Sequence, residues 1–355
     1  MQGSFEIVAA NLAKITGFGL PLLVHAYAVA GAPATSYHLL KTIHVAAAPG
    51  GGEYFDYITF DPDARRVYAS HGTAVNVFDA DSGSVVGTIA GLIRCHGIAV
   101  VHELGKGFIT DGDAGKVVSF DTASLKINAE VKADYDANAI TYDTASRRIF
   151  SFNKASKNVT VIDPAKETVI ATIPLGGAPD ATATDGKGMM YVNLEDVNQV
   201  LAIDSVGLAI KARWPVAPAG QPTSMALDRQ QGRLFIGGRE PKILVVMNTE
   251  NGKILQSFAI GDHVDTTTFD PQTGFTASST REGTINIFRE DSADKFSPVE
   301  NVKTEYGAKT MALDPKTHNL WVDTSDFGAP QPPAKRPNPL PAAIPGTFRM
   351  LIYTR

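Results

Sequence analysis

Polar residues recur through this sequence at intervals of 40 to 44 residues, one in each of seven similar segments. They are Asp56, His96, Asn138, Asp180, Thr223, Asp265 and Lys309. Carboxylate and imidazole groups are common protein ligands of Ca²⁺, Mg²⁺, Mn²⁺ or Zn²⁺. Histidine also exchanges protons near neutral pH. If the fold gathers these residues at one point, they could bind a divalent ion or a polar ligand.

Each of these residues stands directly before a short apolar segment, of which residues 57–61 (YITFD) are the first copy. The seven copies end at Asp61, Val101, Asp143, Asp185, Asp228, Asp270 and Asp314. A period near 42 residues is typical of a β-propeller or another array of stacked units. The repeat therefore predicts a common scaffold that carries the polar positions.

The repeat unit contains four strand-like runs rich in Val, Ile, Thr, Phe and Tyr, separated by turn residues. In the third unit these runs are residues 139–143, 147–153, 158–163 and 168–175. Four strands make one propeller blade. We expect an all-β, seven-bladed β-propeller with four-stranded blades over residues 36–355.

The last unit supplies only three such runs, at residues 310–314, 318–324 and 347–354. Residues 37–45 (YHLLKTIHV) resemble the fourth strand of other units and precede the first blade. We expect this N-terminal strand to complete the last blade by pairing with residues 347–353, which closes the ring and removes its open edges. The proline-rich loop at residues 328–346 could pack over one face or dock a partner.

In a propeller the innermost strands line a central channel, so residues just before them converge on one mouth. Neighbouring residues of the polar positions extend this ring: Glu53, Tyr54, Arg94, Tyr135, Gln221, His263 and Tyr306. We expect Asp56, His96, Asn138 and Asp180, on consecutive or nearby blades, to hold an ion or ligand. His263, Asp265 and Lys309 would contact the remainder of a ligand, and His96 and His263 are the candidate proton carriers. The alternative is that these loops are simply solvated.

The charge, the N-terminal pattern and the cysteine content limit the kinds of partner and the cellular compartment that we expect. The chain has 355 residues, a net charge of -5 and no long Lys/Arg cluster, so nucleic acid is not an expected partner. Residues 15–30 are mostly apolar and are followed by small residues, as in a secretory signal peptide. We expect residues 1–35 to be a leader and the mature protein to be periplasmic or secreted, without a stable membrane span. Cys95 is the only cysteine, which excludes an intramolecular disulfide.

A family resemblance is carried by the repeat itself, with its inner strand ending in Asp and second strands such as Met190, Tyr191, Val192 and Asn193. From residue 36 to residue 355 the chain resembles the YVTN-type bacterial β-propeller repeat family and looks like YncE-like exported propeller proteins. The motif departs from the family pattern in residues 68–71 (YASH) and 320–323 (LWVD). The resemblance implies a fold and export, and it implies no particular reaction.

Two classes of function remain open on the sequence. The first is an exported binding protein that presents the polar mouth to a small molecule, an ion or a protein partner. The second is a metal-dependent hydrolase or lyase of the lactonase type, by analogy with propellers that carry an ion at the channel mouth. The sequence contains no HExxH, G-x-S-x-G, P-loop or dinucleotide-binding motif.

Overall fold

The computed structural model of the chain describes residues 36–329 and 341–355. By its internal contacts the chain divides into residues 1–35 and residues 36–355. The predicted leader and the middle of the proline-rich loop lie outside the described residues. In the part of the chain that is described, no helix has the length and apolar character of a membrane-spanning segment.

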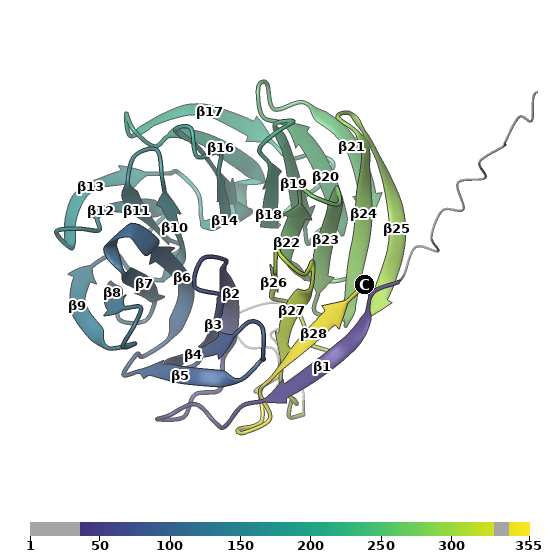
Figure 1. Cartoon of the computed structure of the whole chain (residues 1–355). Helices are drawn as coiled ribbons and strands as arrows, with labels where there is room; N and C mark the ends of the chain where they lie inside the picture. The colour runs from purple at the N-terminus through teal and green to yellow at the C-terminus, as the bar shows by residue number, and fades with distance from the viewer. Residues whose placement is uncertain (1–35, 330–340) are drawn as a thin grey trace, which may run out of the picture. The chain divides into compact units, whose positions relative to one another are not determined.

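Residues 36–355 form seven four-stranded antiparallel sheets arranged as the blades of a ring (Figure 1). This confirms the predicted seven-bladed β-propeller. Blades 1 to 3 consist of β2 (Phe55–Asp61), β3 (Arg66–His71), β4 (Ala74–Asp79) and β5 (Val85–Ala90); β6 (Cys95–Val101), β7 (Lys106–Asp111), β8 (Lys116–Asp121) and β9 (Ile127–Lys132); and β10 (Ala137–Asp143), β11 (Arg148–Asn153), β12 (Asn158–Asp163) and β13 (Thr168–Pro174).

Blades 4 to 6 follow the same plan, with the innermost strand first. They consist of β14 (Pro179–Thr184), β15 (Met189–Leu194), β16 (Gln199–Asp204) and β17 (Ala209–Pro215); β18 (Pro222–Asp228), β19 (Arg233–Gly238), β20 (Ile243–Asn248) and β21 (Ile254–Ala259); and β22 (Val264–Asp270), β23 (Phe275–Thr280), β24 (Thr284–Ser292) and β25 (Lys295–Lys303). Two short 3₁₀ turns, η1 (His102–Leu104) and η2 (Glu195–Val197), follow strands of blades 2 and 4.

Blade 7 is built from both ends of the described chain. It consists of β26 (Met311–Leu313), β27 (Leu320–Thr324), β28 (Arg349–Thr354) and β1 (His38–His44). β1 pairs antiparallel with β28, from His38 opposite Thr354 to His44 opposite Arg349. Figure 1 shows β1 along the outer edge of β28. The predicted closure by an N-terminal strand is confirmed.

The hydrophobic core lies between neighbouring blades. The middle strands have buried side chains on both faces, because each sheet packs against a sheet on either side. Between blades 3 and 4, Phe150 and Phe152 pack in one cluster with Met190 and Val192. The outermost strands are mostly exposed, as in β13. This stacking fixes the inner strands rigidly around the centre of the ring.

The described ends of the proline-rich loop are held together at its base. The Gly328 amide donates to the Ala342 carbonyl at 2.9 Å, and the Ile344 amide donates to Asp326 at 2.8 Å. Phe327 forms an isolated bridge with Ala343 and lies edge-on to Tyr306. The loop therefore leaves blade 7 between β27 and β28, as the sequence predicts.

Candidate functional site

In blades 1 to 6, the predicted polar residues stand at an irregularity of the inner strands. Pairing with the second strand shifts register between Phe55 and Ile58 in β2, and between Cys95 and Ile98 in β6. The inner strands of blades 3 to 6 have a similar shift near their first residues. Such a bulge turns the side chain of the extra residue away from the regular pleat. It therefore sets Asp56 and its counterparts apart from the residues packed between blades.

These residues are buried rather than solvated. Asp56, His96, Asn138, Asp180 and Lys309 are each 9% exposed or less. The interpretation of the mouth as a set of solvated loops is wrong for these positions. Buried charges require partners, because an unpaired charge in a low-dielectric site costs several kcal/mol.

One half of the mouth centres on Asp56. Its carboxylate accepts hydrogen bonds from the Tyr54 hydroxyl at 2.9 Å and from His96 Nδ1 at 2.7 Å. The Lys309 ammonium lies 3.4 Å from Asp56 and 2.5 Å from Asp265, so it bridges two carboxylates of different blades. The Arg94 guanidinium covers the Tyr54 ring at 4.2 Å from its centroid.

In the other half of the mouth, positive and negative side chains also alternate. Arg239 pairs with Asp265 and lies 3.7 Å from Glu195. The Lys154 ammonium then joins Glu195 and Asp180, at 2.6 Å from each. The result is an unbroken chain of alternating charges across the mouth, which runs through Asp56, Lys309, Asp265, Arg239, Glu195, Lys154 and Asp180.

The pairing shifts the proton affinities of these groups in different directions. Burial raises the pKa of Asp56, but the charge of Lys309 and the hydrogen bond from His96 outweigh it and hold the pKa below its usual range. For Asp265, burial is likewise outweighed by Lys309 and Arg239, and the pKa is lowered. Burial dominates at Asp180 and raises its pKa to about 6 against the opposing charge of Lys154. Asp180 thus takes up a proton closer to neutral pH than Asp56 or Asp265 does.

Sequence reasoning missed three of the charged partners, Lys154, Glu195 and Arg239. Each directly follows the second strand of its blade, after Asn153, Leu194 and Gly238. The corresponding residues of the other blades are Gly72, Gly112, Arg281 and Ser325. A second ring of the same period was therefore present in the sequence, and comparing the residue after each second strand would have found it.

Some predicted mouth residues do not join this network. Tyr135 is 61% exposed. His263 contacts its neighbour Asp262 at 2.9 Å. Asn138 Oδ1 is buried and accepts no hydrogen bond from the described residues. Glu53 pairs with His71 beside the mouth.

The predicted ion site at the mouth stays a prediction. Within residues 36–329 and 341–355, Asp56, His96 and Asp180 do not form a group whose ligand atoms all lie within 4.8 Å of one another. Asp56 and Asp180 are each paired with a lysine ammonium. A divalent ion would have to displace these lysines from their carboxylates.

Tyr57 spans the channel beneath the charged network. It follows Asp56 on β2, and its hydroxyl donates to Asp180 of β14 at 3.3 Å. These strands belong to blades 1 and 4, on opposite sides of the ring (Figure 1). Burial raises the pKa of Tyr57 well above its usual value, and the nearby charge of Asp180 raises it further. The tyrosine therefore stays neutral and lies between the mouth and the rest of the channel.

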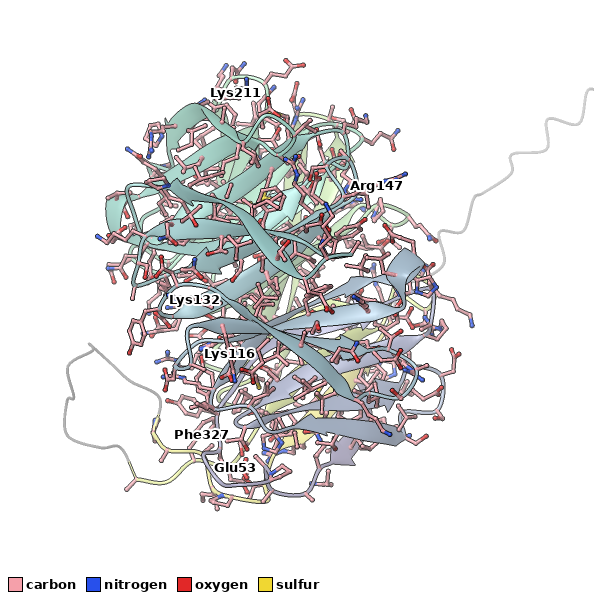
Figure 2. All side chains as sticks on the ribbon, turned by 90° about the vertical axis from the view of Figure 1, so that its left-hand side faces the viewer. Glu53, Lys116, Lys132, Arg147, Lys211 and Phe327 are labelled. Atoms are coloured by element: carbon pink, nitrogen blue, oxygen red, sulfur yellow. The ribbon has the colours of Figure 1, made fainter. Side chains whose placement is uncertain are left out.

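A cavity of about 740 Å³ lies at the other end of the channel. We call this the exit face, because the inner strands end there, and the mouth side the entry face. In the edge-on view of Figure 2, Glu53 of the entry side and Arg147, in the turn after β10, lie toward opposite faces. Six of the seven inner strands, or the turns after them, contribute to the cavity wall, which includes Thr59, Ile98, Thr141, Thr182, Leu227 and Phe269.

The rim of the cavity carries charge, and its wall combines hydroxyl and apolar groups. The residues at the rim include the last residue of β2, Asp61, and three residues that follow inner strands, Asp63, His102 and Arg229. Arg229 Nε donates to the Thr184 carbonyl at 2.9 Å, which fixes its guanidinium beside the cavity. Pockets of this size and mixed lining are typical of small-molecule sites. The repeat pattern did not predict this cavity, since the same strands were expected to act at the entry face.

Comparisons with known proteins agree on the fold. No protein-family model and no curated protein matches the sequence. Among solved structures, the chain is similar to hydrazine synthase from Kuenenia stuttgartiensis, with 14% identity over 79% of this chain and 94% of that chain and a TM-score of 0.67. It is similar to a chain of the mitotic checkpoint complex, with 13% identity over 96% and 99% and a TM-score of 0.72.

The WD40 repeats of RRP9 give a third likeness, with 8% identity over 88% of this chain and 100% of that chain and a TM-score of 0.70. Identities this low show the fold and leave the ligand and chemistry open. The chain is a seven-bladed β-propeller, an architecture that its structural neighbours share.

Proposed function

We propose that this protein is a binding protein that takes a small organic molecule into the channel cavity from the exit face. The observation that carries the proposal is the cavity of about 740 Å³ lined from six blades. A rigid ring that supplies wall residues from six sheets can hold a ligand without reorganising, which reduces the entropic cost of binding.

The wall chemistry supports an amphipathic ligand. Ile98, Leu227 and Phe269 offer apolar contact area, while threonine hydroxyls offer hydrogen bonds. Arg229 adds a cation that could meet an acidic group of the ligand.

The charged mouth supports the same assignment, because its carboxylates already form ion pairs with residues of the protein. The carboxylates of Asp56, Asp265 and Asp180 are paired with lysine or arginine. A ligand at the entry face would have to break these buried pairs, which is costly because it leaves uncompensated charges. We therefore assign the predicted mouth residues to closing the channel and the cavity to binding.

The test is to fill the cavity with a bulky side chain. Thr141 of β10 is half-buried and lines the cavity, whereas Thr172 of β13 is exposed on the outer strand of the same blade. Anilinonaphthalene sulfonate, an amphipathic anion, serves as the probe in a fluorescence titration of the folded protein. We expect saturable binding by the natural sequence, at least tenfold weaker binding by Thr141→Trp, and unchanged binding by Thr172→Trp.

Equal weakening in both variants, or none in Thr141→Trp, would contradict the cavity as the binding site. Circular dichroism of each variant checks that the propeller remains folded. A probe that binds with many weak sites in all three proteins would also reject the proposal, because a single cavity saturates at one molecule per chain.

Export is a separate part of the proposal. It is supported by the apolar run at residues 15–30 and the small residues that follow. The expected result is a mature protein in the periplasm or medium whose N-terminus, read by mass spectrometry, begins within or after residues 26–35. A full-length protein that stays with the cytoplasmic fraction would contradict export.

A further inference from the structure

We propose a divalent cation site at the rim of the cavity, formed by Asp61, Asp63 and His102. One carboxylate oxygen from each aspartate and one ring nitrogen of His102 all lie within 4.8 Å of one another. Within the described residues this is the single group of at least three such side chains with that spacing. None of these residues belongs to the charged mouth, and the site goes beyond the proposed binding of an organic molecule.

The buried member of the group has an unused oxygen. Asp61 is 4% exposed, and its Oδ1 accepts the amides of Asp63 and Ala64 at 3.1 and 3.2 Å. Its Oδ2 is buried and accepts no hydrogen bond from any described residue. A buried carboxylate oxygen without a partner is unfavourable, and a cation would satisfy it.

Three corresponding aspartates in other blades do not have this unused oxygen, because the next blade satisfies it. Asp143 accepts hydrogen bonds from Thr184 and Ser205, at 2.6 and 2.7 Å. Asp270 contacts His318 Nδ1 of blade 7 at 2.7 Å. Asp314 pairs with Arg65 of blade 1 at 2.7 Å. Blade 1 departs from this pattern.

At the junction of blades 1 and 2, His102 of blade 2 lies near Asp61 but forms no hydrogen bond with it. β2 and β6 are neighbours in the ring (Figure 1). In the described part of the chain, no hydrogen bond or ion pair joins His102 to Asp61. The junction therefore brings together two possible ligands, the Asp61 carboxylate and the His102 imidazole. The exposed Asp63 carboxylate supplies a third.

The local backbone holds the donors in place. Pro62 between the two aspartates has a fixed φ, which limits their relative movement. His102 begins the η1 turn, which is closed by the Gly105 amide on the His102 carbonyl at 3.0 Å. Its neighbour Glu103 accepts a hydrogen bond from Tyr142 of blade 3. The loop that carries His102 is therefore tied to two blades.

The donor set selects the kind of ion. Two carboxylates and one imidazole suit Zn²⁺ better than Ca²⁺, which takes six to eight oxygen ligands. Zinc bonds of about 2.0 to 2.2 Å require the three ligand atoms to close toward the ion. Asp63 and His102 are exposed and can make that movement. Three protein ligands would leave a coordination position open toward the cavity.

The test is isothermal titration of ZnCl₂ into the full-length, untagged protein after chelator treatment and dialysis. We expect one ion per chain for the natural sequence. His102→Ala and Asp63→Asn should each bind at least tenfold more weakly, and both replace exposed side chains. His44→Ala, which removes another exposed histidine on β1, is the matched control and should bind as the natural sequence does.

The absence of saturable binding by the natural sequence would overturn the site, and so would His102→Ala binding as tightly as His44→Ala. Asp61→Asn should also lose the ion, and circular dichroism separates that loss from misfolding. The titration contains no organic ligand, so its outcome does not depend on whether the cavity binds one.

Discussion

At the scale of single residues, the mouth is stabilised by lysine side chains long enough to contact two carboxylates each. Lys309 bridges Asp56 and Asp265, and Lys154 bridges Glu195 and Asp180, so each ammonium serves two carboxylates. Removing one partner of a buried pair commonly costs about 3 to 5 kcal/mol, because the other charge stays buried. The chain of pairs therefore makes the mouth rigid and intolerant of single substitutions.

Asp180 gives this network a pH dependence. Its pKa is raised from 3.8 to about 6, chiefly by burial. The folded protein therefore holds this proton more tightly than the unfolded chain between pH 4 and pH 6, and stability falls as pH rises through that window. Asp180→Asn cannot titrate. The free energy of unfolding of the natural protein relative to this variant should fall by up to about 3 kcal/mol from pH 4 to pH 6 and level off above.

Urea unfolding at a series of pH values measures this difference. Asp113→Asn replaces an aspartate whose side chain is 47% exposed and is the control. A difference that rises with pH would contradict the prediction, since it would mean that Lys154 holds Asp180 ionised against the effect of burial.

At the scale of elements, the inner strands of blades 1 to 6 each serve both ends of the channel. The bulge near the start of each strand presents a polar residue to the mouth, and the strand's last residues line the cavity or the rim. In β2 these roles fall to Asp56 and to Thr59 and Asp61. The turn aspartates at the strand ends also join one blade to the next, as in the contact of Asp270 with His318. Variation in a few residues per strand can therefore change the ligand chemistry without changing the blade.

At the scale of the whole molecule, the ring depends on its closure. Blade 7 has four strands only because β1 adds to β28. Tyr37 and Val45, at either end of β1, are buried in two separate core clusters. Without β1, β28 would become an exposed sheet edge and both clusters would lose a member.

Two truncations test this closure. Removal of residues 1–35 leaves β1 and all the contacts described above in place, so the thermal midpoint should be unchanged. Removal of residues 1–45 deletes β1 and should lower the midpoint by roughly 10 °C or more and promote association through the open edge. Differential scanning calorimetry and size-exclusion chromatography measure the two effects. Equal midpoints for both truncations would show that closure by β1 is dispensable.

The sequence by itself determined the architecture of this protein. A period near 42 residues, four strand-like runs per unit and a short last unit were enough to predict seven blades and the pairing of β1 with β28. These features could be predicted because strand patterns are local and the repeat multiplies the same pattern seven times. The sequence also placed Asp56, Asp180, Asp265 and Lys309 at one mouth, since each of them directly precedes the repeated inner strand, whereas Lys154, Glu195 and Arg239 follow second strands and were missed.

The tertiary structure decided which of those residues act together. Lys309 meets Asp56 only because the last blade adjoins the first, and Tyr57 meets Asp180 only because blades 1 and 4 face each other across the channel. The cavity and the unused oxygen of Asp61 likewise depend on how neighbouring blades pack. Contacts between distant segments depend on ring closure and side-chain length, so a one-dimensional repeat could not specify them.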